Sequence, residues 1–200
     1  MKKSPLLLCA VLFCLATVSC TKESETPADA FYDITGTWKL VNMQVQTNVT
    51  NQLAAGSDVS KTITTSNYTT QNNSGTITIT ESTIAGNNLS YTINTVANAS
   101  FYENGTLTGT YSQPMQATIQ AYSSTSAYTR VNADSLYFQS GSFNLGNTEQ
   151  TSLPGGSKIK IEQDKLYLMQ SGMQTTTETV QGQTVSSIVQ AATTVTLQRQ

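Results

Sequence analysis

The chain has 200 residues, a net charge of −2, 11% charged residues, one tryptophan and no histidine. This length, with 38% hydrophobic residues, allows one ordinary core and favours a single folded domain. The weak, dispersed charge offers no basic surface for phosphate groups, which excludes nucleic acid as an expected partner.

The first predicted element is a signal peptide over residues 1–19. Two lysines follow the first methionine, and the apolar run over 5–18 has the length of a signal peptide, too short for a transmembrane helix. The run ends in Ala16-Thr17-Val18-Ser19-Cys20. A small residue directly before a cysteine at this place resembles the lipobox of bacterial lipoproteins. The resemblance implies cleavage after Ser19 and lipidation of Cys20, which would anchor the protein to a membrane. The alternative is an ordinary secretory signal with an incidental cysteine.

Residues 20–30 are polar and predict a flexible tether. The pair Lys22-Glu23 looks like the surface-export signal of Bacteroidota lipoproteins, which implies a lipid-anchored outer-membrane protein exposed at the cell surface. All three cysteines, Cys9, Cys14 and Cys20, lie at or before the predicted lipidation site. The domain over 31–200 is therefore expected to have no disulfide and no thiolate metal site.

The domain opens with the stretch 34–41, which alternates like a β-strand. This alternation predicts that Trp38 and Leu40 share one face and that Val41, Met43 and Val45 share the other. Residues 47–70 are weakly patterned and predict a long loop or a ragged edge strand. Strands are then expected over 76–80 and 89–93, joined across residues 86–88.

Four later turns predict the remaining strands. Asn104-Gly105 is a strong type I′ turn signal and places Tyr102 opposite Leu107. A turn over 132–135 is expected to place Val131 opposite Leu136 and Arg130 opposite Tyr137. A turn over 162–165 places two aliphatic pairs on one face, Ile161 opposite Leu166 and Ile159 opposite Leu168. A last strand over 193–200 follows a turn at 181–183.

About nine to eleven short antiparallel strands are thus expected, with no helical stripe, and the fold class is all-β. An antiparallel up-and-down β-barrel is the favoured architecture, because a closed sheet has no edge strands to aggregate. A two-sheet β-sandwich is the alternative.

The start of the first strand, Gly36-Thr37-Trp38, resembles the glycine-x-tryptophan signature of lipocalins. With the last strand, Thr196-Leu197-Gln198-Arg199, it is similar to the lipocalin-like domains of Bacteroidota lipoproteins. The resemblance implies a lipocalin-like barrel over 31–200 in which Arg199 stacks over Trp38 and closes one end.

The sequence offers little catalytic chemistry. Without histidine or a thiol in the mature chain, only carboxylates, Ser, Lys and Tyr remain. Glu162 and Asp164 flank a hairpin tip, where solvated acids are the default, and Ser157-Lys158 should point to opposite faces of a strand. We therefore expect no enzyme activity, no catalytic residue, no cofactor and no metal site. Asp134-Ser135-Leu136 matches the short motif at which Bacteroidota O-glycosylate exported proteins, which makes Ser135 a candidate modification site.

The leading hypothesis is a non-enzymatic, lipid-anchored, lipocalin-like protein that binds a small apolar or glycan-like ligand in its lumen or at its open end. Arg130 beside Tyr137 is the candidate ligand-binding pair. A structural or adhesive surface lipoprotein, such as a pilus-like subunit or an accessory component of glycan uptake, is the alternative. A hydrolase using two nearby carboxylates is a third, remote hypothesis.

Overall fold

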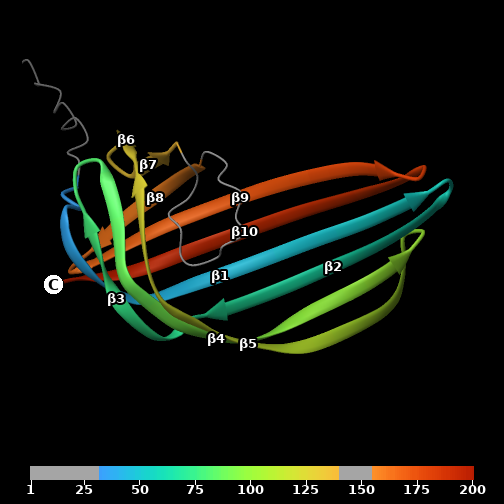
Figure 1. The fold of residues 1–200 in the computed structure, drawn as a ribbon, viewed down its shortest axis with the longest axis horizontal. Coiled ribbons are helices and arrows are strands. Elements are labelled where there is room, and N and C mark those ends of the chain that lie inside the picture. The colour runs from blue at the N-terminus through green and yellow to red at the C-terminus, as the bar shows by residue number, and fades with distance from the viewer. Residues whose placement is uncertain (1–31, 140–154) are drawn as a thin grey trace, which may run out of the picture.

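The computed structural model describes residues 32–139 and 155–200, and every regular element in them is a β-strand (Figure 1). Neighbouring strands run antiparallel and all belong to one sheet, so the predicted all-β class is confirmed. The strands are β1 (Gly36–Ala55), β2 (Asp58–Thr69), β3 (Gln71–Ile79), β4 (Thr83–Glu103), β5 (Thr106–Ala127), β6 (Thr129–Asn132), β7 (Ser135–Phe138), β8 (Gly155–Glu162), β9 (Lys165–Val180) and β10 (Gln183–Arg199).

The strand order is β2-β4-β3-β1-β10-β9-β8-β7-β6, with β5 paired to β4. β2 and β3 both lie between β1 and β4, one after the other along these two strands. β3 pairs with the start of β1 over residues 36–39, and β2 pairs with the rest of β1 over residues 44–55. The long strands β1, β4, β5, β9 and β10 therefore run on, with β2, into an extension beyond the short strands (Figure 1).

The hydrophobic core gathers at the end of the sheet where β3, β6, β7 and β8 lie, which we call the core end. Its side chains come from both ends of the domain, as the lipocalin resemblance implies. The fully buried ones are Ile34, Trp38, Leu40, Met43, Ile77, Ile79, Ile84, Leu89, Leu136, Phe138, Leu166 and Leu197. The face of the sheet that carries them is called the core face below, and the opposite face is the outer face.

A β-bulge at Val41 corrects the predicted alternation of the first strand. The register of β1 against β10 shifts between Leu40 and Asn42, so one residue is left over. Because of that extra residue, Met43 points to the same face as Trp38 and Leu40, and all three are buried. The prediction that Met43 and Val45 lie on the opposite face from Trp38 was wrong, since strict alternation cannot anticipate a bulge.

Two of the predicted hairpins are confirmed at the level of residue pairs. Tyr102 lies opposite Leu107 across a turn in which Asn104 and Gly105 have φ of 46° and 82°. The hairpin of β8 and β9 places Ile161 opposite Leu166 and Ile159 opposite Leu168, as expected from the aliphatic pattern. Both are local pairings that turn chemistry alone specifies.

Three other local predictions were wrong. Residues 47–70 contain the second half of β1 and all of β2, which pair with each other and with β10 and β4. The turn between β3 and β4 lies at 80–82, where Thr80 Oγ1 accepts from the backbone N–H of Thr83 at 3.0 Å. Arg130 lies opposite Leu136, and Tyr137 lies opposite Thr129, because a bulge after Arg130 shifts the hairpin by one residue.

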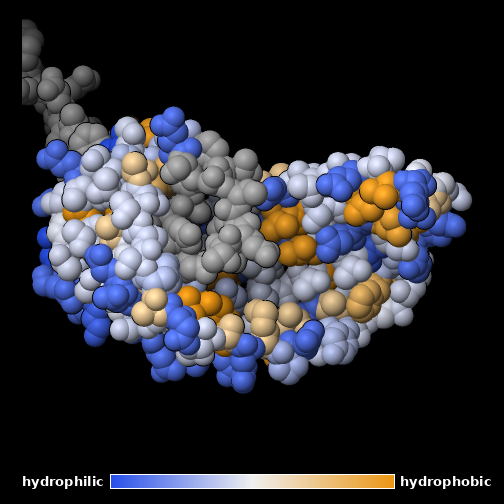
Figure 2. Space-filling view, in the orientation of Figure 1, coloured by the Kyte–Doolittle hydropathy of each residue, from blue (hydrophilic) through white to orange (hydrophobic). Residues whose placement is uncertain are grey.

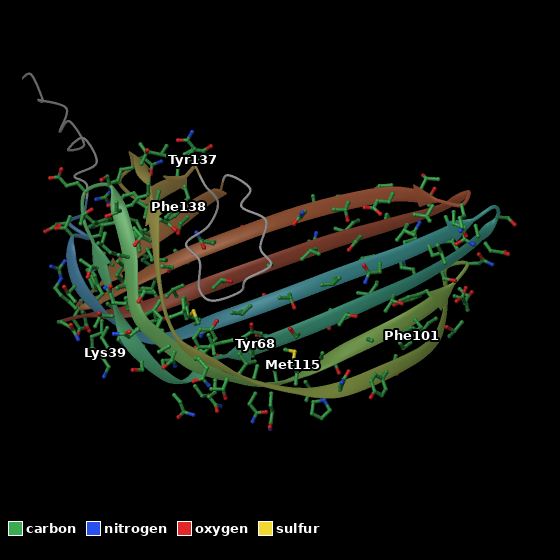
Figure 3. The ribbon with its side chains drawn as sticks, in the orientation of Figure 1. Lys39, Tyr68, Phe101, Met115, Tyr137 and Phe138 are labelled. Atoms are coloured by element: carbon green, nitrogen blue, oxygen red, sulfur yellow. The ribbon has the colours of Figure 1, made fainter. Side chains whose placement is uncertain are left out.

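No described strand forms a second layer over the core face of the extension. Leu53, Phe101, Met115, Val185 and Val189 belong to this face by their registers, and each remains 38–42% exposed. Figure 2 shows apolar groups on the extension, and Figure 3 places Phe101 and Met115 well away from the core end. Exposed apolar surface of this kind is typical of an interaction site.

Candidate functional site

Trp38 is the centre of the core end. Its ring is 1% exposed, and its Nε1–H donates to the carbonyl oxygen of Ile34 at 2.9 Å, so burial leaves no unpaired polar group. The guanidinium carbon of Arg199 lies 4.6 Å from the centre of the ring. The contact expected between Trp38 and Arg199 is present, and it is made possible by their direct pairing across β1 and β10.

Arg199 is itself held in place by the segment before β1. Its Nη2 donates to the carbonyl oxygen of Asp33 at 2.9 Å, and its backbone N–H donates to the carbonyl oxygen of Asp164. Asp33 accepts two hydrogen bonds from Thr35, which together with the nearby arginines hold the pKa of its carboxyl below the usual value. First and last segments of the domain are thereby fixed beside each other.

Two buried tyrosine hydroxyls in the core differ in their partners. Tyr128 Oη donates to the carbonyl oxygen of Thr80 at 2.6 Å, whereas Tyr122 Oη is buried without a partner among the described residues. We expect Tyr128→Phe to lower the free energy of unfolding by about 1 kcal/mol and Tyr122→Phe to leave it unchanged or raise it. Urea denaturation of both variants checks this, and equal losses in both would contradict it.

The buried hydroxyl of Tyr91 should make the free energy of unfolding depend on pH in alkaline solution. Burial, with a smaller contribution from Tyr68, raises the pKa of Tyr91 to about 12. The unfolded chain loses this proton near pH 10. Tyr91 in its neutral form therefore contributes its full stabilisation of the folded state below about pH 10, and this contribution is lost as the pH rises towards 12. Urea denaturation between about pH 8 and pH 11 should show this decline, and Tyr91→Phe should make it shallower; an identical decline in the variant would count against Tyr91.

The predicted ligand-binding pair is not brought together. Arg130 shares the face of Leu136, while Tyr137 points to the outer face and is 42% exposed. The guanidinium of Arg130 donates to the backbone carbonyls of Tyr32 and Ala133, which ties the start of the domain to the β6–β7 turn. Arg130 therefore has a structural role at this position.

The other predicted sites fall in different places. Ser135 is half-buried at the start of β7, and its Oγ donates to Asp134 Oδ1 at 2.8 Å; its glycosylation stays a prediction. Cys20 lies outside the described residues. Glu162 is ion-paired with Lys160 in solvent, and that lysine lowers the pKa of its carboxyl. Asp164 accepts from Gln198 Nε2 at 2.9 Å.

Residues 32–139 and 155–200 contain neither a cluster of metal-ligating side chains nor a membrane-spanning helix. No three His, Cys, Asp or Glu side chains there lie close enough together to hold a metal ion. The same residues contain no helix with the length and apolar character needed to span a bilayer.

A groove of about 780 Å³ crosses the extension on the outer face. One wall is the transverse row in which Asn48 lies between Thr65 and Gln190, with Asn98 next to Thr65. The other wall is the row of Asn67, Gln46, Ala192 and Ser171. Residues of the row between them point to the core face, so their backbone forms the floor. We call this the amide groove.

The lining of the amide groove is uncharged and rich in carboxamides. Five carboxamides face it, from Gln46, Asn48, Asn67, Asn98 and Gln190, and hydroxyls of Thr65 and Ser171 add to them. Asn98 Oδ1 accepts from Ser112 Oγ at 2.7 Å, and Gln190 Nε2 lies 3.5 Å from Met173 Sδ. A carboxamide both donates and accepts hydrogen bonds, so the groove presents both functions without a net charge.

Sequence reasoning missed this site, although a signal was present. Gln44, Gln46 and Asn48 occupy every second position of β1, on the face away from the core. That alternation marks a polar face of one strand. It cannot show which residues of β2, β4, β9 and β10 complete the wall, because those partners come from distant parts of the chain.

A second, smaller groove of about 490 Å³ lies beside the first and shares Ser171 and Ala192 with it. Its walls include Lys158, Met169 and Tyr137. No family model, curated protein or solved structure matches the chain. Function is therefore argued from the geometry of the amide groove and of the sheet that forms it.

Proposed function

We propose that this protein is a non-enzymatic, lipid-anchored, lipocalin-like protein of the outer membrane that binds a neutral, hydroxyl-rich ligand, such as an oligosaccharide, in the amide groove. The observation that carries the proposal is the groove's volume of about 780 Å³ together with its uncharged carboxamide and hydroxyl lining. Anchoring at Cys20 and exposure at the cell surface are supported by the leader and tether sequence over residues 1–30.

The chemistry of the lining favours a sugar over an ion. Each hydroxyl of a sugar can donate one hydrogen bond and accept others, which matches carboxamides such as those of Asn48 and Gln190. An anionic or cationic ligand would lose its hydration without gaining an opposite charge. Met173 and Ala192 add apolar contact area of the kind that a sugar ring can cover.

An apolar ligand inside the core end is less well supported. Trp38, Leu89, Leu166 and Phe138 are all at most 1% exposed there, so side chains already fill the space. The ligand hypothesis therefore moves from the lumen to the outer face, and from an apolar to a glycan-like compound.

We infer that the sheet closes into a lipocalin-like barrel at the core end. The inference is supported by the join between β5 and β6, which are separated by Tyr128 alone. Residues 83 and 127 pair β4 with β5, and β6 continues the same line into its pairing with β7. The backbone N–H of Tyr128 donates to the carbonyl of Ser82 at 2.8 Å, which holds the join against the sheet. An experimental structure with β5 and β6 splayed apart would end this inference.

Binding can be tested with the chain from residue 21 onward, which retains every described strand and core residue. An array of neutral oligosaccharides followed by titration calorimetry should identify a ligand. Asn48→Leu and Gln190→Met remove hydrogen-bonding groups at nearly constant volume, and each should weaken binding about 2- to 10-fold, the equivalent of about 0.5–1.5 kcal/mol. Gln44→Met, on the same face but outside the groove, is the matched control.

Two results would contradict the proposal. Failure of every neutral oligosaccharide to bind would remove the ligand class, and equal affinities for wild type, Asn48→Leu and Gln190→Met would remove the site. Release of shorter sugars from a bound oligosaccharide would instead revive the carboxylate hydrolase.

A second candidate function is a structural or adhesive surface lipoprotein. It is favoured by the edges of the extension, where β5 and the outer half of β9 have a paired neighbour on one side only among the described strands. Electron microscopy of the purified protein tests it, because a structural subunit should form ordered polymers at moderate concentration.

A further inference from the structure

The outer half of β9 is an open edge among the described strands. β9 pairs with β10 along its whole length, but its pairing with β8 ends at Gln170. Among the described strands, the backbone of residues 171–180 therefore pairs with β10 alone. At about 3.3 Å per residue this edge is roughly 33 Å long.

The two hairpins that bound β9 show which backbone groups face the open side. Lys165 pairs with Glu162 across a two-residue turn, so its backbone groups point towards β8. Val180 pairs with Gln183 in the same way, so its backbone groups point towards β10. Alternation between these ends directs the N–H and C=O groups of Ser171, Met173, Thr175, Thr177 and Thr179 to the open side.

This edge lacks the features that normally prevent strand addition. Its register with β10 is regular throughout, and residues 171–180 contain no lysine, no arginine and no proline. Edge strands are usually protected by such residues or by bulges. The other open edge, β5, has them: Pro114 lies in its middle, and the register of β5 with β4 shifts at three places.

We propose that two copies of this chain associate by antiparallel pairing of their β9 edges about a two-fold axis through Thr175. In this register Thr175 pairs with its own copy, Met173 with Thr177, and Ser171 with Thr179. Every outward-pointing residue of the edge then has a partner. Centring the axis on Met173 or Thr177 instead leaves part of the edge unpaired.

The side chains suit this register. Glu178 carries the only charge on the edge and lies opposite Gly172 of the other copy, so no like charges meet. Ser171 and Met173 also line the amide groove, so in this register the grooves of the two copies lie on one continuous outer face and are offset along the strands.

Sedimentation equilibrium of the chain from residue 21 onward tests the proposal. Wild type should show twice the mass of one chain. Thr177→Lys should shift the protein to monomer, because it puts a charge at the edge, while Thr110→Lys on β5 should leave the dimer intact. Thr175→Pro is a second disrupting variant; the residue donates to the open side, so the β9–β10 ladder survives and circular dichroism should remain that of wild type.

Disulfide crosslinking tests the proposed register between the two β9 strands. The chain from residue 21 has no cysteine, and two Cα atoms in a hydrogen-bonded antiparallel pair lie about 5.5 Å apart, within disulfide range. Thr175→Cys should therefore form a disulfide-linked dimer on mild oxidation, and Thr110→Cys should not. A monomeric wild type, a dimer unaffected by Thr177→Lys, or protection of the outward-pointing amides of residues 171, 173, 175, 177 and 179 in a monomer would each overturn the proposal. Oligosaccharide binding is measured separately, so either proposal can fail alone.

Discussion

Trp38→Ala is expected to lower the free energy of unfolding by about 3–5 kcal/mol, the cost of removing a large aromatic side chain from a packed core. Trp38 is 1% exposed, and it touches the segment before β1 as well as the last strand through Ile34 and Arg199. A loss of this size is a large part of the total stability of a domain. Chemical denaturation followed by circular dichroism measures it.

Arg199→Gln provides the matched comparison for Trp38→Ala. It removes the cation over the ring while leaving Trp38 buried, and it should cost only about 0.5–2 kcal/mol. If Trp38→Ala cost no more than Arg199→Gln, Trp38 would not be the centre of the core.

Gly75→Ala is expected to lower the free energy of unfolding by at least about 2 kcal/mol, because both the backbone angle and the available space exclude a side chain. Gly75 has φ of +96°, and a Cβ there would lie 2.5 Å from the carbonyl oxygen of Asn88 and 2.7 Å from that of Asn87. These are backbone atoms of β4, so they cannot move aside as a flexible side chain would. Thermal and urea denaturation check the prediction.

Gly36→Ala separates the two causes. Gly36 has φ of +120° but nothing within 4 Å of an added Cβ, so its substitution carries only the backbone strain. Gly36→Ala should lower the free energy of unfolding by less than Gly75→Ala does, the difference being at least about 1 kcal/mol. Equal losses at both positions would show that the close approach of β3 and β4 at Gly75 is unimportant for stability.

The extension explains why the core and the candidate site lie in different places. A sheet with one layer can bury apolar side chains only where it curls over itself, as around Trp38 and Phe138. Beyond that region no described strand covers either face of the sheet. Within the described part of the chain, this single layer leaves the amide groove open and the outer half of β9 paired only with β10.

The sequence by itself determined the features that depend on neighbouring residues. Alternation and turn chemistry predicted an all-β domain, the hairpins at Asn104-Gly105 and at 162–165, and a last strand over 193–200. The resemblance at the two ends of the domain implied the contact between Trp38 and Arg199. These features are either local in the chain or marked by rare residues.

Only the tertiary structure decided the rest, because it depends on pairings between distant segments. The bulge at Val41 exists because it lets both Leu40 and Met43 reach one core, which strict alternation within the strand cannot reveal. The insertion of β2 between β1 and β4 turned an apparently unpatterned stretch into strands. The amide groove needs residues from β1, β2, β4, β9 and β10 in one register, and no single segment of the chain contains that information.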